Sequence, residues 1–258
     1  MFGRRKIAAL VAEFLGTGAL TLLLLSVQRS TIGVPFFVAG ATGLAITVMT
    51  FAFYRVSGAQ LNPALTIALW TARKITFVRM LTFIVAQLLG AYLAYLLYTY
   101  FVKNGLQPIG GKFSGRILTA EIIGTMLLSL GYAAALYQRF TVGAAAAVAG
   151  LAYMVGSIAA SPASLGLLNP AIALGVHAWV PTTYALGPII GALIGVNLYG
   201  FLFADRELRA AVENKSAVVP VVAPVVVTSK SGRKPRSESV KVVPAKTRST
   251  NKRTVTKK

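Results

Sequence analysis

The stretch SGAQLNPALT, residues 57–66, interrupts strongly apolar sequence with Ser, Gly, Gln, Asn and Pro. A second stretch, SLGLLNPAIA at residues 164–173, repeats its Asn-Pro-Ala core in the other half of the chain. Asn is a preferred N-cap residue, and Pro is favoured at the first helical position because its missing N–H would have no partner there. Each stretch therefore predicts a short helix that starts at its Asn, NPALTIALW in the first case and NPAIALGVHAW in the second.

The composition around these stretches is that of a membrane protein. Apolar residues make up 56% of the 258 residues and the mean hydropathy is +0.71, whereas soluble domains usually contain about 45–50% apolar residues. Between Phe14 and Ala204 the only carboxylate is Glu121. The chain has no cysteine, which excludes disulfides and thiolate metal sites. These features favour an integral membrane protein over a soluble domain with a large core.

Six apolar stretches are long enough to cross a ~30 Å hydrocarbon layer as helices. They are residues 7–27, 34–53, 77–102, 117–137, 141–160 and 184–203. Strands would require a closed barrel with a period-2 pattern, which the sequence does not show. The first stretch has a basic start like a signal peptide, but its apolar run is too long and no A-x-A cleavage site follows. We therefore expect it to remain as the first span.

The basic residues of the connectors predict the orientation. With a cytoplasmic N-terminus, eight lie on the cytoplasmic side and four on the other, before the C-terminal tail is included. Cytoplasmic loops carry the excess of Lys and Arg, so both termini are expected in the cytoplasm of a cell-membrane protein. The eight are Arg4, Arg5, Lys6, Arg55, Arg73, Lys74, Arg79 and Arg139, and the four are Arg29, Lys103, Lys112 and Arg116.

The chain also contains an internal repeat. AEFLGT at residues 12–17 recurs as AEIIGT at 120–125, an offset of 108, and Asn62 recurs as Asn169, an offset of 107. A weaker similarity relates QLLGAYLA at residues 87–94 to PIIGALIG at residues 188–195. Each half therefore contains three spans and one Asn-Pro-Ala segment. Because three is odd, the second half must be inverted relative to the first, and duplicated broken segments in an inverted repeat indicate a transport site.

The two short helices suggest how such a site works. Each is about ten residues, or ~15 Å long, which is half the hydrocarbon thickness. They can enter from opposite faces and meet at the midplane, where irregular backbone is tolerated if it lines a polar path. Two positive helix ends and two Asn amides would favour neutral solutes and oppose cations. A single Asn-Pro-Ala could be an ordinary capped helix start, but two copies at matched places favour the pore.

These residues resemble a known family. SGAQLNPALT is similar to the loop-B signature of the aquaporin and glycerol-facilitator family (major intrinsic proteins), and LLNPAIA is similar to its loop-E partner. AEFLGT, AEIIGT, AQLLGAY and GPIIGALIG extend the resemblance over about residues 7–204. It implies an all-α membrane protein with six transmembrane helices and two re-entrant half-helices. It also implies a homotetramer with one pore per subunit that passes water or small uncharged solutes such as glycerol or urea, without catalysis, cofactor or metal.

The resemblance also assigns roles to residues. Asn62 and Asn169 match the pore-lining amides, and Glu13 and Glu121 match buried glutamates that accept hydrogen bonds from the re-entrant backbone. The alternative role for these glutamates is a proton relay or pH sensor, because carboxylates inside a membrane often serve such functions. By the same resemblance, the residues expected to lock the two half-helices together are Pro63, Ala64, Pro170 and Ala171.

The sequence departs from the family at the outer constriction. The family usually carries Arg three residues after the second Asn, where this chain has Ile172, and no Arg occurs in residues 140–205. The other constriction positions fall, by spacing, at Thr42, Ser157 and Gly166. We therefore expect a selectivity filter that is wider and more apolar than in a strict water channel.

Two further positions and one face also stand out. Gln60 stands where SG-x-H-x-NP members carry His. His177, the only histidine, could line the outer mouth or cap the second short helix, and we expect the capping role. Gly187, Gly191 and Gly195 form a small-xxx-small face for close helix packing.

The halves of the predicted channel domain, residues 1–204, are 7–102 and 117–204, and a tail of residues 205–258 follows. The tail has 14 basic and 4 acidic residues and a low-complexity Val-Pro run, which predict disorder in the cytoplasm. Its basic clusters could bind anionic membrane lipid, and no specific nucleic acid is expected. Two other functions stay open. One is a secondary active transporter, although few intramembrane charges are available for coupling, and the other is a structural or adhesive membrane protein with a closed pore.

Overall fold

Helices account for all regular secondary structure in the part of the chain that the computed structural model describes, residues 3–28, 34–109, 111–178 and 180–204. The predicted tail lies outside these residues, so the division into channel domain and tail stays a prediction. In chain order the helices are α1 (Arg4–Gln28), α2 (Pro35–Phe53), α3 (Pro63–Thr71), α4 (Phe77–Val102), α5 (Gly115–Tyr137), α6 (Val142–Ala160), α7 (Pro170–Gly175), the π-helical turn η1 (Pro181–Ala185) and α8 (Leu186–Leu202).

Six of the helical segments are long and apolar enough to cross a membrane, which confirms the six predicted spans. Their ends differ from the prediction by a few residues. The first span begins at Arg4, and the sixth begins at Pro181 with η1, three residues earlier than expected. Proline is well suited to a first helical position, so the apolar pattern alone places this start too late. Large apolar side chains such as Phe36, Tyr100 and Phe201 are exposed, as expected for a surface that faces lipid.

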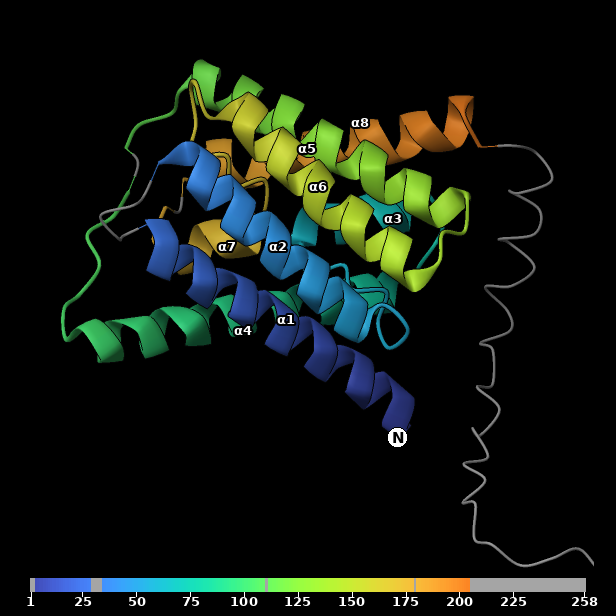
Figure 1. Cartoon of the computed structure of the whole chain (residues 1–258), viewed down its shortest axis with the longest axis horizontal. Helices are drawn as coiled ribbons and strands as arrows, with labels where there is room; N and C mark the ends of the chain where they lie inside the picture. Colours follow the sequence, from blue (N-terminus) through green and yellow to red (C-terminus); the bar gives the residue numbers. More distant parts are fainter. Residues whose placement is uncertain (1–2, 29–33, 110, 179, 205–258) are drawn as a thin grey trace, which may run out of the picture. The chain divides into compact units, whose positions relative to one another are not determined.

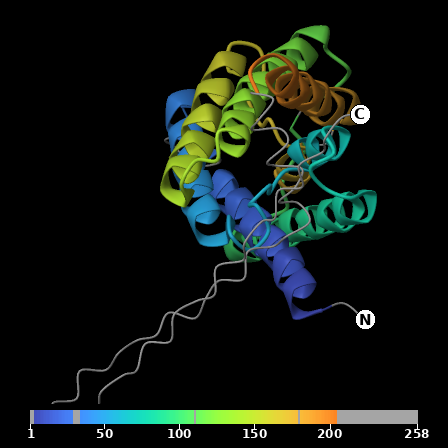
Figure 2. The ribbon, with the colours of Figure 1, turned by 90° about the vertical axis from the view of Figure 1, so that its right-hand side faces the viewer.

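The packing of the long helices follows the repeat. The first and last long helices of each half pack together, α1 with α4 and α5 with α8, while α2 and α6 join the two halves. Figure 1 shows α1 crossing next to α4, and Figure 2 shows the same helices from the side with the N-terminus at the free end of α1. The two halves therefore repeat the same pairing of helices.

Small residues allow some of these pairs to approach closely. On α8, a Cβ added at Gly191 would run into the carbonyl of Ile122, and one at Gly195 would run into the Ser129 side chain. The predicted small-xxx-small face therefore packs against α5. Gly90 of α4 meets the Phe14 carbonyl of α1 in the same manner.

The two short helices lie between the long ones (Figure 1). The helix α3 contacts α8 and α4, and α7 contacts α4 and α1. We call residues 57–71 the first re-entrant segment and residues 164–175 the second. The end of the helical body at which α1 ends and α2 begins is called the α7 mouth, because the second re-entrant segment is inserted from there.

Candidate functional site

Both re-entrant segments start their helix at the predicted Asn. Asn62 is the N-cap of α3, with extended backbone at φ −156° and ψ 116°, and its side-chain oxygen accepts a hydrogen bond from the Ala64 N–H at 2.9 Å. Asn169 does the same for α7, where the N–H groups of Ala171 and Ile172 donate at 3.0 and 3.4 Å. Because Pro at the next position has no N–H to satisfy, the Asn-Pro pair defines each start locally.

The same two side chains connect the segments to each other. The amide nitrogen of Asn62 donates to the Leu168 carbonyl at 2.9 Å, and that of Asn169 donates to the Leu61 carbonyl at 2.8 Å. Both Asn side chains are buried, with 3% exposure. An amide N–H₂ carries two hydrogens, so each Asn retains one donor after the crossing bond is made. Two neutral donors therefore lie at the point where the ends of α3 and α7 meet.

The backbone just before each Asn is strained. Ala59 and Leu61 in the first segment have φ of 48°, and Leu168 in the second has φ of 52°. Such left-handed conformations are unfavourable for residues with a Cβ and persist where surrounding contacts hold them. The strain turns the peptide N–H groups of both segments toward buried acceptors, and these acceptors are the two glutamates.

Glu13 on α1 holds the first segment. Its carboxylate accepts from the N–H groups of Gln60 at 3.0 Å and Leu61 at 2.6 Å. A third donor is the Gln87 amide of α4 at 2.7 Å, which also donates to the Thr66 hydroxyl at 3.0 Å. Gln87 was not singled out from the sequence. The signal that could have identified it is a polar amide inside an apolar span, at the first position of the QLLGAYLA motif.

Glu121 on α5 holds the second segment. Its carboxylate accepts from the N–H groups of Leu167 at 3.1 Å and Leu168 at 2.8 Å, and from the hydroxyl of Ser164. The Ser164 hydroxyl also accepts from the Gly166 N–H at 3.1 Å. Both glutamates are fully buried. The structure thus places both carboxylates against re-entrant backbone, in the arrangement that the scaffold hypothesis requires.

Two tyrosines and an arginine add contacts that the sequence did not reveal. The Tyr132 hydroxyl donates to the Gly58 carbonyl at 2.9 Å, and the Tyr153 hydroxyl donates to the Leu167 carbonyl at 3.1 Å. Arg79 donates to the Ser57 carbonyl at 2.8 Å. Each contact joins residues at least 14 positions apart along the chain. Such contacts depend on the packed fold, so local pattern does not identify them.

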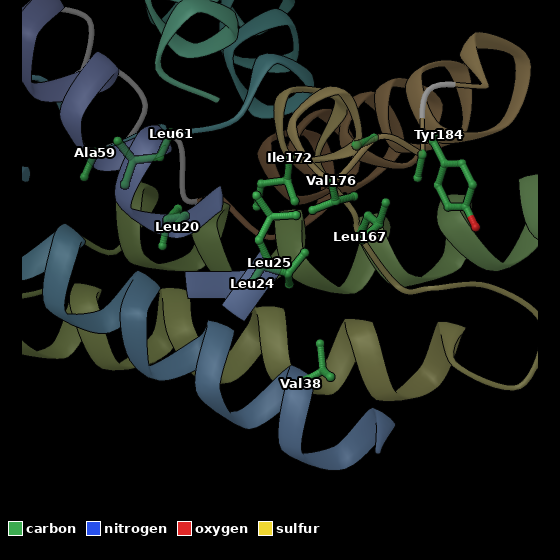
Figure 3. Close-up of a cluster of buried hydrophobic side chains, with 12 residues drawn as sticks. Leu20, Leu24, Leu25, Val38, Ala59, Leu61, Leu167, Ile172, Val176 and Tyr184 are labelled. Atoms are coloured by element: carbon green, nitrogen blue, oxygen red, sulfur yellow. The ribbon is translucent and has the colours of Figure 1, made fainter. Parts of the chain in front are cut away.

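The four predicted constriction residues separate into two environments. Ser157 lies beside Gly166, where an added Cβ would come within 2.7 Å of the Ser157 hydroxyl, and Ser157 has 5% exposure. Thr42 and Ile172 have 0% exposure. The Thr42 hydroxyl donates to its own helix, at 2.8 Å from the Val38 carbonyl. Ile172 belongs to an apolar cluster, which Figure 3 shows with Val176, Leu24 and Leu25 close to it.

The second short helix is shorter than predicted. It ends at Gly175 because the Ala178 N–H turns back to the Ala173 carbonyl and His177 adopts a left-handed φ of 63°. The His177 side chain does not cap this helix, which corrects the expected role. Its Nδ1 pairs with the Leu106 carbonyl at 2.8 Å, and its own carbonyl accepts from the Ile109 N–H at 2.8 Å. His177 therefore ties the α4–α5 connector to the end of α7.

Comparisons with known proteins agree with this geometry. The sequence matches the family described as Major intrinsic protein over residues 4–199. It is similar to a probable aquaporin TIP3-2 of Oryza sativa subsp. japonica, at 34% identity over 207 residues that cover 74% of this chain and 77% of the relative. Aquaporin Z of Photorhabdus laumondii is 29% identical over 228 residues, covering 77% of this chain and 98% of the relative.

A solved structure has the same fold. The aquaglyceroporin from Plasmodium falciparum superimposes with a TM-score of 0.66 and 20% sequence identity, covering 81% of this chain and 99% of that one. At this identity the likeness concerns the fold.

Proposed function

The chain belongs to the major intrinsic protein family, and from this premise we propose that its pore conducts solutes as large as glycerol or urea in addition to water. The protein is a passive multi-pass membrane channel for water and small solutes, and it is not an enzyme. A secondary active transporter is not favoured. The proposal therefore concerns which neutral solutes pass and which residues select them.

The centre of the proposed pore is the pair Asn62 and Asn169. Each amide keeps one N–H for a passing solute oxygen after its crossing hydrogen bond to the other segment. The amides are neutral donors, and the helix ends beside them carry partial positive charge. A cation would lose its hydration shell there without gaining an anionic partner, while water, glycerol and urea would be accepted.

The observation that carries the proposal is the absence of a fixed positive charge at the constriction. Ile172 takes the position at which the family usually carries Arg, and residues 140–205 contain no Arg. Ser157 and Gly166, at two of the other positions predicted for the constriction, are small residues. Without a guanidinium, the pore loses a group that would narrow it and donate to solutes, so larger neutral solutes are admitted.

Stopped-flow light scattering on proteoliposomes tests this proposal with water, glycerol and urea in turn. We expect measurable permeability to all three solutes. The variant Ile172→Arg should lower glycerol and urea permeability more than water permeability, because the long cation would occupy the constriction. A protein that conducts water and completely rejects glycerol and urea would refute the wide filter. No permeability at all would favour a closed structural role.

We propose further that the channel is a homotetramer in the cell membrane with both termini in the cytoplasm. The excess of Lys and Arg in the connectors on one side supports this orientation. The broad exposed apolar surface of the long helices is available for lipid and for neighbouring subunits. The basic tail would then face the cytoplasmic leaflet, where anionic lipid attracts each Lys or Arg by ~1 kcal/mol.

A further inference from the structure

A groove of about 450 Å³ lies between the first half of α1 and the first half of α4. The two helices touch where Gly90 approaches the Phe14 carbonyl, and α1 leaves α4 from there toward the N-terminus (Figure 1). The walls of the groove come from residues 10–14 of α1 and 81–89 of α4. Its volume is within the range of sites that hold small molecules, about 300–1,000 Å³.

The corresponding place in the second half of the chain is closed by direct helix contact. The repeat pairs Leu10 with Leu118, since AEFLGT and AEIIGT are offset by 108, and it pairs Ala86 with Gly187, the residues before QLLGAYLA and PIIGALIG. A Cβ added at Gly187 would lie 3.2 Å from the Leu118 carbonyl, so α5 and α8 touch there. At the equivalent point of the first half, Leu10 and Ala86 line the groove instead. The groove therefore distinguishes the first half from the second.

The described wall of the groove is apolar. Thr82 is its one polar side chain, and the Thr82 hydroxyl donates to the Val78 and Arg79 carbonyls of its own helix at 3.0 and 3.1 Å. Both walls belong to candidate membrane spans. A polar group placed in the groove would lose its hydrogen bonds to water without gaining a partner from these walls. The matching occupant is therefore a hydrocarbon chain.

Basic side chains lie beyond the end of the groove that is nearest the N-terminus. Arg4 lies seven residues, or two helical turns, before Val11, and Lys6 lies four residues, or one turn, before Leu10. Both basic residues are exposed. Since Val11 and Leu10 line the groove, Arg4 and Lys6 flank the face of α1 that forms its wall.

These cations have no acidic side chain to pair with in the described part of the chain. Its two carboxylates are Glu13 and Glu121, and both are fully buried against the re-entrant backbone. Arg4 and Lys6 are therefore available to an anion outside the protein. Near a membrane surface, each such cation attracts anionic lipid.

We propose that this groove is a binding site for an anionic glycerophospholipid of the leaflet at the start of α1. One acyl chain lies in the groove against Val11 and Val85, and the lipid phosphate pairs with Arg4 and Lys6. A zwitterionic phospholipid has the same hydrocarbon but no net charge, so it gains less from the two cations. The inference goes beyond the proposed function, because it holds whichever solute the pore conducts.

Bound lipid would also support the first re-entrant segment. Phe14 and Ala86 of the groove are the chain neighbours of Glu13 and Gln87, which hydrogen-bond to each other at 2.7 Å. A ligand that binds the folded protein and not the unfolded chain stabilises the folded state. An anionic lipid bound to both helices therefore stabilises the pair that holds this segment.

Native mass spectrometry of the full-length protein in detergent tests the headgroup. Phosphatidylglycerol should bind more tightly than phosphatidylcholine with the same acyl chains, and Arg4→Gln or Lys6→Gln should each weaken phosphatidylglycerol binding about fivefold. Arg5→Gln is the matched control, because Arg5 lies one turn before the buried Ala9 and so on another face of α1. Equal affinity for the two lipids, or an equal loss in Arg5→Gln, would overturn the inference.

A second pair of variants tests the groove itself. Val85→Trp fills the groove and should weaken the binding of both lipids. Leu186→Trp is the control, because Leu186 is the exposed residue at the equivalent position of the second half. Unchanged lipid binding in Val85→Trp would show that the headgroup binds surface cations without the groove. A change in oligomer mass with unchanged lipid binding would assign the groove to a second copy of the chain. Either result overturns the inference.

Cross-linking in the unmodified protein gives the same decision if Val85→Trp does not fold. Phosphatidylglycerol with a photoactivatable group in its acyl chain should cross-link to residues 10–14 and 81–89, and Arg4→Gln/Lys6→Gln should reduce this labelling. Phosphatidylglycerol should also raise the melting temperature more than phosphatidylcholine does, and the double variant should lose the difference. Labelling spread evenly over all the spans would contradict the site.

Discussion

The two re-entrant segments have the same strained backbone before the Asn but differ in the side chains that hold them in place. In each, a buried glutamate accepts two consecutive N–H groups of the strained backbone before the Asn. The third donor to Glu13 is Gln87, which comes from the long helix α4, whereas the third donor to Glu121 is Ser164, which belongs to the second segment itself. The helix that follows is also longer in the first segment, nine residues against six.

The duplicated halves therefore differ in how their segments are attached. The first segment is attached to the surrounding helices through Gln87 and, by way of the Ser57 carbonyl, through Arg79. The second segment has an internal fastening at Ser164, is attached to α6 through the Tyr153 hydroxyl, and contributes Leu165 to the wall of a cavity of about 300 Å³ at the α7 mouth. We infer that the first segment contributes more to stability and that the second contributes more to solute selection.

The largest expected effect is the loss of either glutamate. Glu13→Ala or Glu121→Ala leaves two buried N–H groups without an acceptor, at roughly 1–3 kcal/mol for each group. Glu13→Ala should be the more damaging, because its third lost donor is an N–H of the fully buried Gln87 amide, whereas that of Glu121 is the half-buried Ser164 hydroxyl. Thermal unfolding in detergent, together with the yield of folded protein, measures both. Normal yield and melting, with a change only in the pH response of flux, would instead support the proton-relay hypothesis.

The next effect concerns the amides at the crossing point. Asn62→Asp or Asn169→Asp replaces a donor by a carboxylate that faces the opposite carbonyl, so neutral-solute flux should fall roughly tenfold or cations should enter. The two variants should behave alike, because the crossing bonds have nearly equal lengths, 2.9 and 2.8 Å.

Flux assays and ion-conductance measurements on both variants check this symmetry. Asn197→Asp on α8 is the control, since Asn197 bonds to Thr71 and Leu193 and takes no part in the crossing. Unchanged flux and unchanged ion exclusion in both test variants would remove Asn62 and Asn169 from the pore.

The smallest expected effect compares the hydrogen bonds of Gln87, in the first segment's surroundings, with those of Ser164, in the second segment. Gln87→Leu and Ser164→Ala each remove hydrogen bonds worth about 1 kcal/mol apiece. Gln87→Leu should lower the melting temperature with little change in the ratio of glycerol to water permeability. Ser164→Ala should change that ratio, because Ser164 positions Gly166 beside Ser157. Thr119→Ala, at an exposed hydroxyl bonded to its own helix, serves as the control. Identical responses of the two variants would contradict the division of roles.

Much of the fold is predictable from local pattern. Apolar runs of sufficient length specify the spans, and Asn followed by Pro specifies where α3 and α7 begin, because both signals act within one helix. The ends are less predictable. The helix α7 stops at Gly175 although apolar sequence continues, since a turn at His177 directs its carbonyl to Ile109, far away in the sequence.

The sequence by itself determined the six spans, the duplicated Asn-Pro-Ala starts and the absence of Arg from residues 140–205, since each of these can be read from neighbouring residues. Only the tertiary structure decided which groups meet. The crossing bonds of Asn62 and Asn169 join residues 106 and 108 positions apart, and Gln87 reaches Glu13 across 74 positions. The burial of Ile172 is also a product of packing. Such contacts depend on which helices pack together, and a buried polar group takes whichever partner the packed helices bring within reach.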